Sequence, residues 1–211
     1  HGSNVCFNDS NTVLSDQRHL CVAHLQSRKW VVIHHCIAAR LCSKFGAEEV
    51  VPCTQWALWT AKLNVKDPRV GSVFGWHQDA PYWIHDSEHV ERLPNVMVLF
   101  DDANADNGCF RVIDGSHRAG CLPGCEDGRQ LQGFYTHPDC VDESAQVLIE
   151  APAGAAIFFD PHIVHGSGAN ESDFPRRAII ITYQPTGFAA LKSGRVREIL
   201  LWLRARPLTP R

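Results

Sequence analysis

The sequence lacks the features of membrane and exported proteins. No apolar run among its 211 residues reaches about eighteen, the length that a membrane-spanning helix needs. No positively charged segment followed by an apolar centre opens the chain, so no secretory signal is expected. We therefore expect a cytoplasmic protein with no membrane partner. Because the chain begins at His1 and not at a methionine, we also expect a trimmed N-terminus.

A strong excess of charge is also missing. The formal net charge is −3, so no overall basic field attracts nucleic acid, and we expect no nucleic-acid partner. Only the segment 192–211 has a strong excess of positive charge, with six Lys or Arg residues against one Glu. Its apolar residues share one face of a predicted helix, which we expect to pack on the sheet or to support a homo-oligomer, with membrane-surface binding as the lesser alternative. These residues are Val196, Ile199, Leu200 and Leu203.

The nine cysteines include no CxxC pair, which argues against a zinc ribbon or a redox motif. Their odd number favours reduced thiols that pack as small apolar side chains. Cys121 and Cys125 flank a Pro-Gly turn and are near enough in the sequence for a disulfide, although nothing in the sequence requires one.

The apolar share of 45% and the charged share of 20% are those of a globular protein, and the length suits a single domain, 1–211. Residues 1–48 are expected to hold two helices. The first begins at Ser15 or Asp16 and runs to about Ser27, and the second spans Val31 to Phe45 and stops at Gly46. A β core is expected over 49–188, followed by the basic tail 189–211.

From Val50 the chain consists of short runs rich in Val, Ile, Trp, Phe and Thr, with Pro, Gly, Asn and Asp between them. This pattern predicts an all-β sandwich or barrel, and the scarcity of intervening helices argues against a parallel α/β sheet. The predicted strands are VVPCTQWALWTAKLNV, VFGWHQDAPYW, NVMVLFDD, CFRVIDG, QVLIEAPAG, AAIFFD and RRAIIITYQP. We expect a long loop from Gly115 to Ser144, and the run DDANADNG is a turn because it lacks the ligand order of a calcium loop.

The stretch GWHQDAPYW places a histidine and an aspartate two residues apart. On a strand, alternation would point His77 and Asp79 to one face and turn Gln78 away. His165, in HGS after a later apolar strand, supplies a third candidate ligand, whereas His162 would face the other side of an extended strand. Two histidines and one carboxylate form the face that binds iron(II) with open positions, and the same set can bind zinc.

Arg176 lies on the next apolar strand, eleven residues after His165. Its planar guanidinium can hold a carboxylate through two parallel hydrogen bonds. An organic acid that binds beside the metal is therefore a candidate ligand.

With these motifs the sequence resembles the phytanoyl-CoA dioxygenase family of oxygenases that use iron(II), 2-oxoglutarate and O₂. The resemblance covers about 31–185, through WTAKLNV, WHQDAPYW, LFDDANADNGCFRVIDGSHRAG and PAGAAIFFDPHIVHGSGANESDFPRRAIIITYQPTG. It implies a double-stranded β-helix, or jelly roll, with the N-terminal helices on its larger sheet. It also implies oxidation, most often hydroxylation, of a small organic substrate, with release of succinate and CO₂.

Carried over by position, the resemblance implies roles for several residues. His77, Asp79 and His165 would bind the iron, and Arg176, with Ser167, would bind the distal carboxylate of 2-oxoglutarate. The weaker matches are Lys62 and Asn64 for the co-substrate, and Gln78, Tyr82 and Trp83 for the substrate. Asp79 stands where related halogenases lack a carboxylate, which favours hydroxylation, and Met97 stands where some members have an aromatic residue.

Two alternatives stay open. A jelly roll that binds 2-oxoglutarate without turnover would keep the pocket and release no succinate. A zinc-dependent hydrolase would use the same three ligands with a general base, and would have no role for Arg176.

Overall fold

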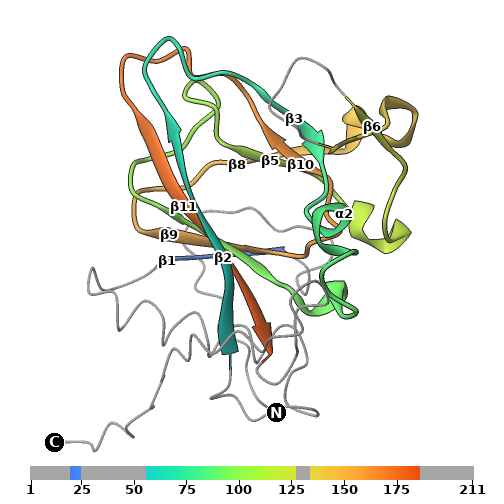
Figure 1. Ribbon diagram of the computed structural model, residues 1–211. Coiled ribbons are helices and arrows are strands. Elements are labelled where there is room, and N and C mark those ends of the chain that lie inside the picture. The colour runs from blue at the N-terminus through green and yellow to red at the C-terminus, as the bar shows by residue number, and fades with distance from the viewer. Residues whose placement is uncertain (1–19, 25–55, 127–133, 186–211) are drawn as a thin grey trace, which may run out of the picture.

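The computed structural model describes residues 20–24, 56–126 and 134–185. Eleven strands and several short helical turns occur in these ranges (Figure 1). The strands are β1 Leu20–His24, β2 Trp56–Lys66, β3 Phe74–His77, β4 Asn95–Leu99, β5 Phe110–Ile113, β6 Gly124–Glu126, β7 Phe134–Thr136, β8 Gln146–Ile149, β9 Ala155–Phe159, β10 His165–Ser167 and β11 Arg176–Pro185. The helical elements are α2 Ala80–Trp83 and the 3-10 turns η2 Val90–Arg92, η3 Ser116–Ala119, η4 Pro138–Cys140 and η5 Glu143–Ala145. Within these ranges no helix is long and apolar enough to cross a membrane.

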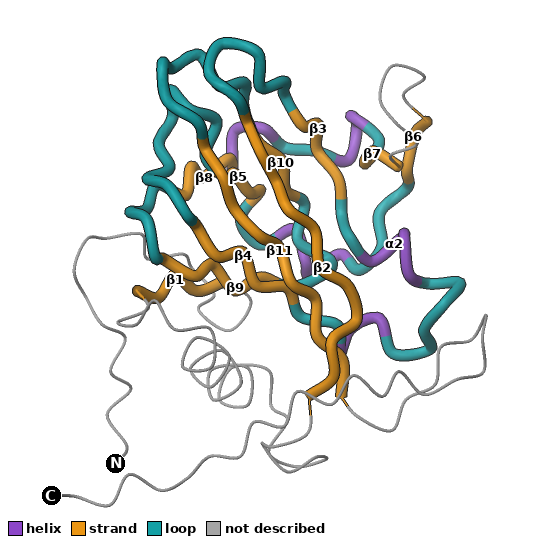
Figure 2. Tube along the Cα trace, turned by 60° about the vertical axis from the view of Figure 1, so that its left-hand side comes forward, coloured by secondary structure: helices purple, strands orange, loops and turns teal. Residues whose placement is uncertain are grey.

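Two antiparallel sheets form the two layers of the fold (Figure 2). The larger sheet has the strand order β1-β9-β4-β11-β2, and the smaller has the order β3-β10-β5-β8. Chain neighbours are split between the layers, since β9 lies in the larger sheet and β10 in the smaller. This alternation between two facing sheets is the double-stranded β-helix that was expected.

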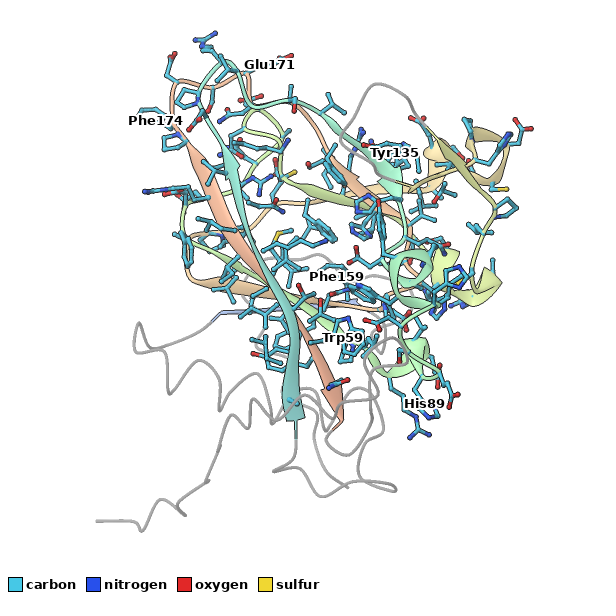
Figure 3. The ribbon with its side chains drawn as sticks, viewed as in Figure 1. Trp59, His89, Tyr135, Phe159, Glu171 and Phe174 are labelled. Carbon is cyan, nitrogen blue, oxygen red and sulfur yellow. The ribbon has the colours of Figure 1, made fainter. Side chains whose placement is uncertain are left out.

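The core lies between the sheets. Strands β4 and β9 are buried along their whole length, which explains their nearly continuous apolar sequences. One cluster joins side chains of both layers: Met97, Leu99, Phe110, Val112, Ile149, Ile157, Phe159 and Ala178. Figure 3 shows Phe159 in this interior, whereas Glu171 and Phe174 lie on the exposed loop before β11.

The prediction of a helix from Ser15 to about Ser27 is wrong at its centre. Residues Leu20–His24 form β1, which pairs with β9 from Leu20 opposite Phe159 to His24 opposite Ala155. Hydrogen bonding to an existing sheet edge outweighs a weak local helix preference, because propensity is small beside tertiary pairing. The predicted helices over 31–45 and in the C-terminal tail lie outside the described residues.

The predicted loop Gly115 to Ser144 contains a small hairpin of β6 and β7, which is a second departure from the sequence prediction. The Tyr135 ring of β7 lies against β3 at Gly75, where a Cβ atom would come within 2.7 Å of the ring. Glycine at this position therefore lets the hairpin dock on the smaller sheet (Figure 3). Cys121 beside this hairpin is an exposed free thiol.

Candidate metal and oxo-acid site

Two histidines from neighbouring strands face each other at the edge of the cavity between the sheets. His77 ends β3, His165 begins β10, and the two residues are register partners. Their ring centroids lie 4.0 Å apart. The strands approach closely at Gly166, where a Cβ atom would come within 2.7 Å of the Phe74 carbonyl oxygen. A larger residue at Gly166 would therefore push the two histidines apart.

Both imidazoles are oriented by backbone carbonyl groups. Nδ1 of His77 lies 3.0 Å from the Gly75 oxygen, and Nδ1 of His165 lies 2.9 Å from the Ile163 oxygen. Since each Nδ1 must carry the proton to donate there, each Nε2 keeps its lone pair for a metal. Burial, helped by the neighbouring His165, holds the pKa of His77 well below its ordinary value, and burial also lowers the pKa of His165. Both rings are therefore neutral, as metal ligation requires.

Asp79 lies beside the two histidines, but the local backbone structure that places it there differs from the predicted strand. Strand β3 ends at His77, and Asp79 is the N-cap of α2 with φ −80° and ψ −30°, so strand alternation does not place it. Pro81 favours this helix start, and the Pro161 oxygen accepts the N–H groups of Asp79 and Ala80 at 3.0 and 2.9 Å. The turn still directs the carboxylate to the same point.

The carboxylate is held by a buried amide. Asn95 of β4 donates to Oδ2 of Asp79 at 2.9 Å, and its own oxygen accepts a hydrogen bond from the Thr182 hydroxyl at 2.6 Å. Asn95 is fully buried, so water does not replace these bonds. Such support behind a ligand fixes the direction of its lone pairs.

The three side chains form a site that fits one metal ion. Asp79 oxygens lie 3.8 Å from Nε2 of His77 and 3.8 Å from Nε2 of His165. All three ligand atoms lie within 4.8 Å of one another, and all three residues are buried. Two neutral imidazoles and one carboxylate suit iron(II) or zinc, and they leave further coordination positions to ligands from outside the chain.

Arg176 begins β11 and is 2% exposed. Its Nη2 donates to the Gly108 oxygen at 3.1 Å, whereas Nε and Nη1 have no hydrogen-bond partner. Burial lowers the pKa of this guanidinium, although an arginine stays charged. Gly108 has φ +73°, and a Cβ atom there would lie 2.4 Å from the Gly168 oxygen, so only glycine fits the turn that carries this acceptor. Two buried donors without acceptors indicate a seat for an anion.

The metal-binding group and Arg176 open on one cavity of about 330 Å³. Of the predicted co-substrate and substrate residues, Lys62, Asn64, Ser167 and Trp83 line it. Lys66 also lines the cavity, although no sequence motif indicated it. Further wall residues that were not predicted are Thr60, Phe110, Ile180 and Thr182. Lys66 could have been found, because it continues the period-two face of Lys62 and Asn64.

Gln78, which was predicted to contact substrate, does not line this cavity. Its side chain is 1% exposed and points away from the cavity. The amide nitrogen donates to the oxygens of Gly120 and His162, and the amide oxygen accepts from the Leu122 N–H at 2.8 Å. Through these hydrogen bonds the Gln78 side chain joins three chain segments.

Two other aromatic or imidazole side chains flank the site. The Tyr82 ring centroid lies 6.4 Å from that of His77, and Lys62 Nζ lies 5.8 Å from the same Tyr82 ring, so Tyr82 stands beside the cavity without lining it. His162 lies in a turn and not on a strand, with its Nδ1 3.2 Å from Asp160, and it takes no part in the metal-binding group.

A family model described as phytanoyl-CoA dioxygenase (PhyH) matches residues 4–178. L-proline trans-4-hydroxylase of Streptomyces griseoviridis is 32% identical over 139 residues, which cover 58% of this chain and 52% of the relative. An ectoine dioxygenase of Bordetella bronchiseptica is 31% identical over 138 residues, which cover 58% of this chain and 44% of the relative. The chain thus spans about half the length of the curated relatives it matches.

Among solved structures, the apo form of the non-heme monooxygenase ThoJ matches with a TM-score of 0.62 and 26% identity. The match covers 75% of this chain and 56% of that one. The family match extends over the three candidate metal ligands and Arg176, on a fold shared with a non-heme monooxygenase. The chain therefore belongs to the phytanoyl-CoA dioxygenase family.

Proposed function

We propose that this chain is the core of an oxygenase that uses iron(II) and 2-oxoglutarate to oxidise a C–H bond of a small organic molecule, most often by hydroxylation. The reaction consumes 2-oxoglutarate and O₂ and releases succinate and CO₂. One observation carries the proposal: His77, Asp79 and His165 share a cavity with a buried guanidinium that has two unused donors. The substrate is a small molecule handled in the cytoplasm, and no nucleic-acid partner is assigned.

The side chains of the site have separate roles in this proposal. His77, Asp79 and His165 would hold the iron, which when bound supplies the oxygen chemistry. Their carbonyl and amide partners keep the donor atoms oriented before the metal arrives.

Arg176 would pair with the distal carboxylate of 2-oxoglutarate through its unpartnered N–H groups, beside Ser167. The acid is then held with its oxo acid end free for the metal. Lys62 and Asn64 lie along the same wall. Met97, Phe110 and Ile180 supply apolar walls that exclude water from the acid.

Trp83 is assigned to the substrate side, since it lines the cavity from α2 next to Asp79. Tyr82 borders the same side. The cavity size suits a small metabolite together with the oxo acid.

The test is succinate release from 2-oxoglutarate with iron(II) and O₂, screened across metabolite pools. Arg176→Met should raise the KM for 2-oxoglutarate at least about thirtyfold, because charged hydrogen bonds of about 2 kcal/mol are lost. Arg177→Met is the matched control, since Arg177 is exposed and pairs with Asp101 at 2.7 and 2.8 Å. 2-Oxoglutarate binding without any succinate would support the inactive binding protein, and activity with zinc in the absence of oxygen would support the hydrolase.

A further inference from the structure

Lys66 is, after Arg176, a second buried cation in the cavity, and it has no role in the proposed reaction as described above. It ends β2 directly opposite Arg176 in the strand register, and it is 7% exposed. Its ammonium donates to the Ser72 carbonyl oxygen, and Asn170 fixes its backbone by donating to the Lys66 oxygen at 2.9 Å. An ammonium has three donors, so one neutral acceptor does not balance its burial.

No acid offsets this charge in the described part of the chain. The only carboxylate that lines the cavity there is Asp79, which belongs to the metal-binding group. The charged groups that act on Lys66 are Arg176 of β11 and Arg111 of β5. The part of the cavity wall that Lys66 and Arg176 form is therefore cationic, and no acid among the described lining residues other than Asp79 faces the cavity.

We propose that Lys66 is a second anchor for the carboxylate that Arg176 seats, and that binding of this acid in mildly alkaline solution captures a proton on the Lys66 amine. The inference rests on the proposed function, in which the acid is 2-oxoglutarate. The proton comes from the solvent, and no covalent bond changes.

The direction follows from the surroundings of the amine. Burial first, then the charges of Arg176 and Arg111, lower the pKa of Lys66 to about 8. A carboxylate placed beside it favours the charged form, so the pKa of Lys66 rises when the acid binds. Below about pH 8 the amine already carries its proton and binding takes up none. Above that pH the Lys66 amine is mostly neutral and must take up a proton when 2-oxoglutarate binds. The affinity for 2-oxoglutarate therefore falls by up to about tenfold per pH unit.

The experiment is calorimetric titration of the full chain, loaded with Ni(II), with 2-oxoglutarate at pH 7 and pH 9. Each titration is repeated in buffers of low and high ionisation enthalpy, which reports the number of protons taken up. For the unmodified chain we expect the Kd to rise about tenfold from pH 7 to pH 9, with uptake approaching one proton at pH 9.

Two variants separate a charge effect from a structural one. Lys66→Arg keeps the charge without titrating, so its Kd should stay tight at pH 9 with no proton uptake. Lys66→Met removes the charge, so its Kd should be at least about tenfold weaker at pH 7 and equal at both pH values. The metal ligands are the same in all three proteins, so any pH effect on the metal cancels in the comparison.

The outcomes distinguish the two proposals. Failure of the unmodified chain to bind 2-oxoglutarate at either pH would refute the proposed function itself. Binding with a Kd that does not change with pH, or the unmodified pH profile in Lys66→Met, would overturn the role of Lys66 alone. If Lys66→Met does not fold, the unmodified chain and Lys66→Arg still decide the question.

Discussion

Asn95 controls the direction of the Asp79 carboxylate at the scale of single residues. Its amide stands between Asp79 and the Thr182 hydroxyl, and all three groups are shielded from water. A carboxylate without this donor can rotate about its side-chain bonds, and rotation misaligns the oxygen that would contact the metal. The chain places this support on β4, in the larger sheet, whereas the strands of both histidines belong to the smaller sheet.

Asn95→Leu should weaken metal binding by about 10-fold to 100-fold, the usual effect of losing support behind a ligand. Anaerobic titration with iron(II), or Co(II) followed by absorbance, measures this change. Thr182→Val is the matched control, because it leaves the bond between Asn95 and Asp79 in place, and its loss should stay under about tenfold. Unchanged metal affinity in a folded Asn95→Leu protein would show that the amide does not orient the carboxylate.

At the scale of elements, the start of α2 depends on contacts from distant segments. Gln78 joins the junction of β3 and α2 to the segments at Gly120, Leu122 and His162. The Pro161 oxygen adds two backbone hydrogen bonds at the same junction. The position of Asp79 therefore depends on how the turn between β9 and β10 meets the end of β3.

Gln78→Met should lower the free energy of unfolding by roughly 3 kcal/mol, because three hydrogen bonds to partly buried backbone groups, each worth about 1 kcal/mol, are lost. Urea denaturation measures the change. Gln146→Met is the control: Gln146 is exposed and its side-chain oxygen accepts a hydrogen bond from Arg111 at the surface, so we expect a change within about 0.5 kcal/mol. Normal stability combined with a raised substrate KM in Gln78→Met would restore the substrate role that the sequence suggested.

Strand prediction succeeded where a residue pattern alone determines the structure. The apolar runs of β4, β9 and β11 have to be buried, and their sequences predict buried strands. Arg176 lies at the start of β11, as its position before AIIITY indicated. Strand β1 was missed because its stability comes from pairing with β9, and no local pattern records a distant sheet edge. The β6 and β7 hairpin was missed for a similar reason, since Tyr135 docks on Gly75 of another strand.

The sequence predicted the side chains that could bind a metal, but not the side chains that orient them. Histidine and carboxylate spacing identified the group of His77, Asp79 and His165, yet the model of a continuous strand through Asp79 was wrong because Ala80 and Pro81 begin a helix. Asn95 carries no local signal, since an asparagine before an apolar strand usually ends a turn.

At the scale of the whole molecule, the cavity joins the two layers. Its candidate ligand groups come from β3 and β10 of the smaller sheet, from β2 and β11 of the larger one, and from Asp79 at the start of α2. A metal and an organic acid bound there would connect the sheets across the core. Because these ligands bind only the folded state, they should stabilise the entire domain and not only the strands that touch them.

We therefore expect the Tm to rise in two separable steps. Ni(II) should raise it first, and 2-oxoglutarate at 100 times its Kd should add about 2.7 kcal/mol of stability, or roughly 5–10 °C for a domain of this size. In Arg176→Met, tested at the same 2-oxoglutarate concentration, the second step should largely disappear while the Ni(II) step remains. In His77→Ala the Ni(II) step should be lost. Differential scanning calorimetry measures both steps, and an undiminished 2-oxoglutarate step in Arg176→Met would place the acid elsewhere in the molecule, because a ligand can stabilise the fold only through the groups that bind it.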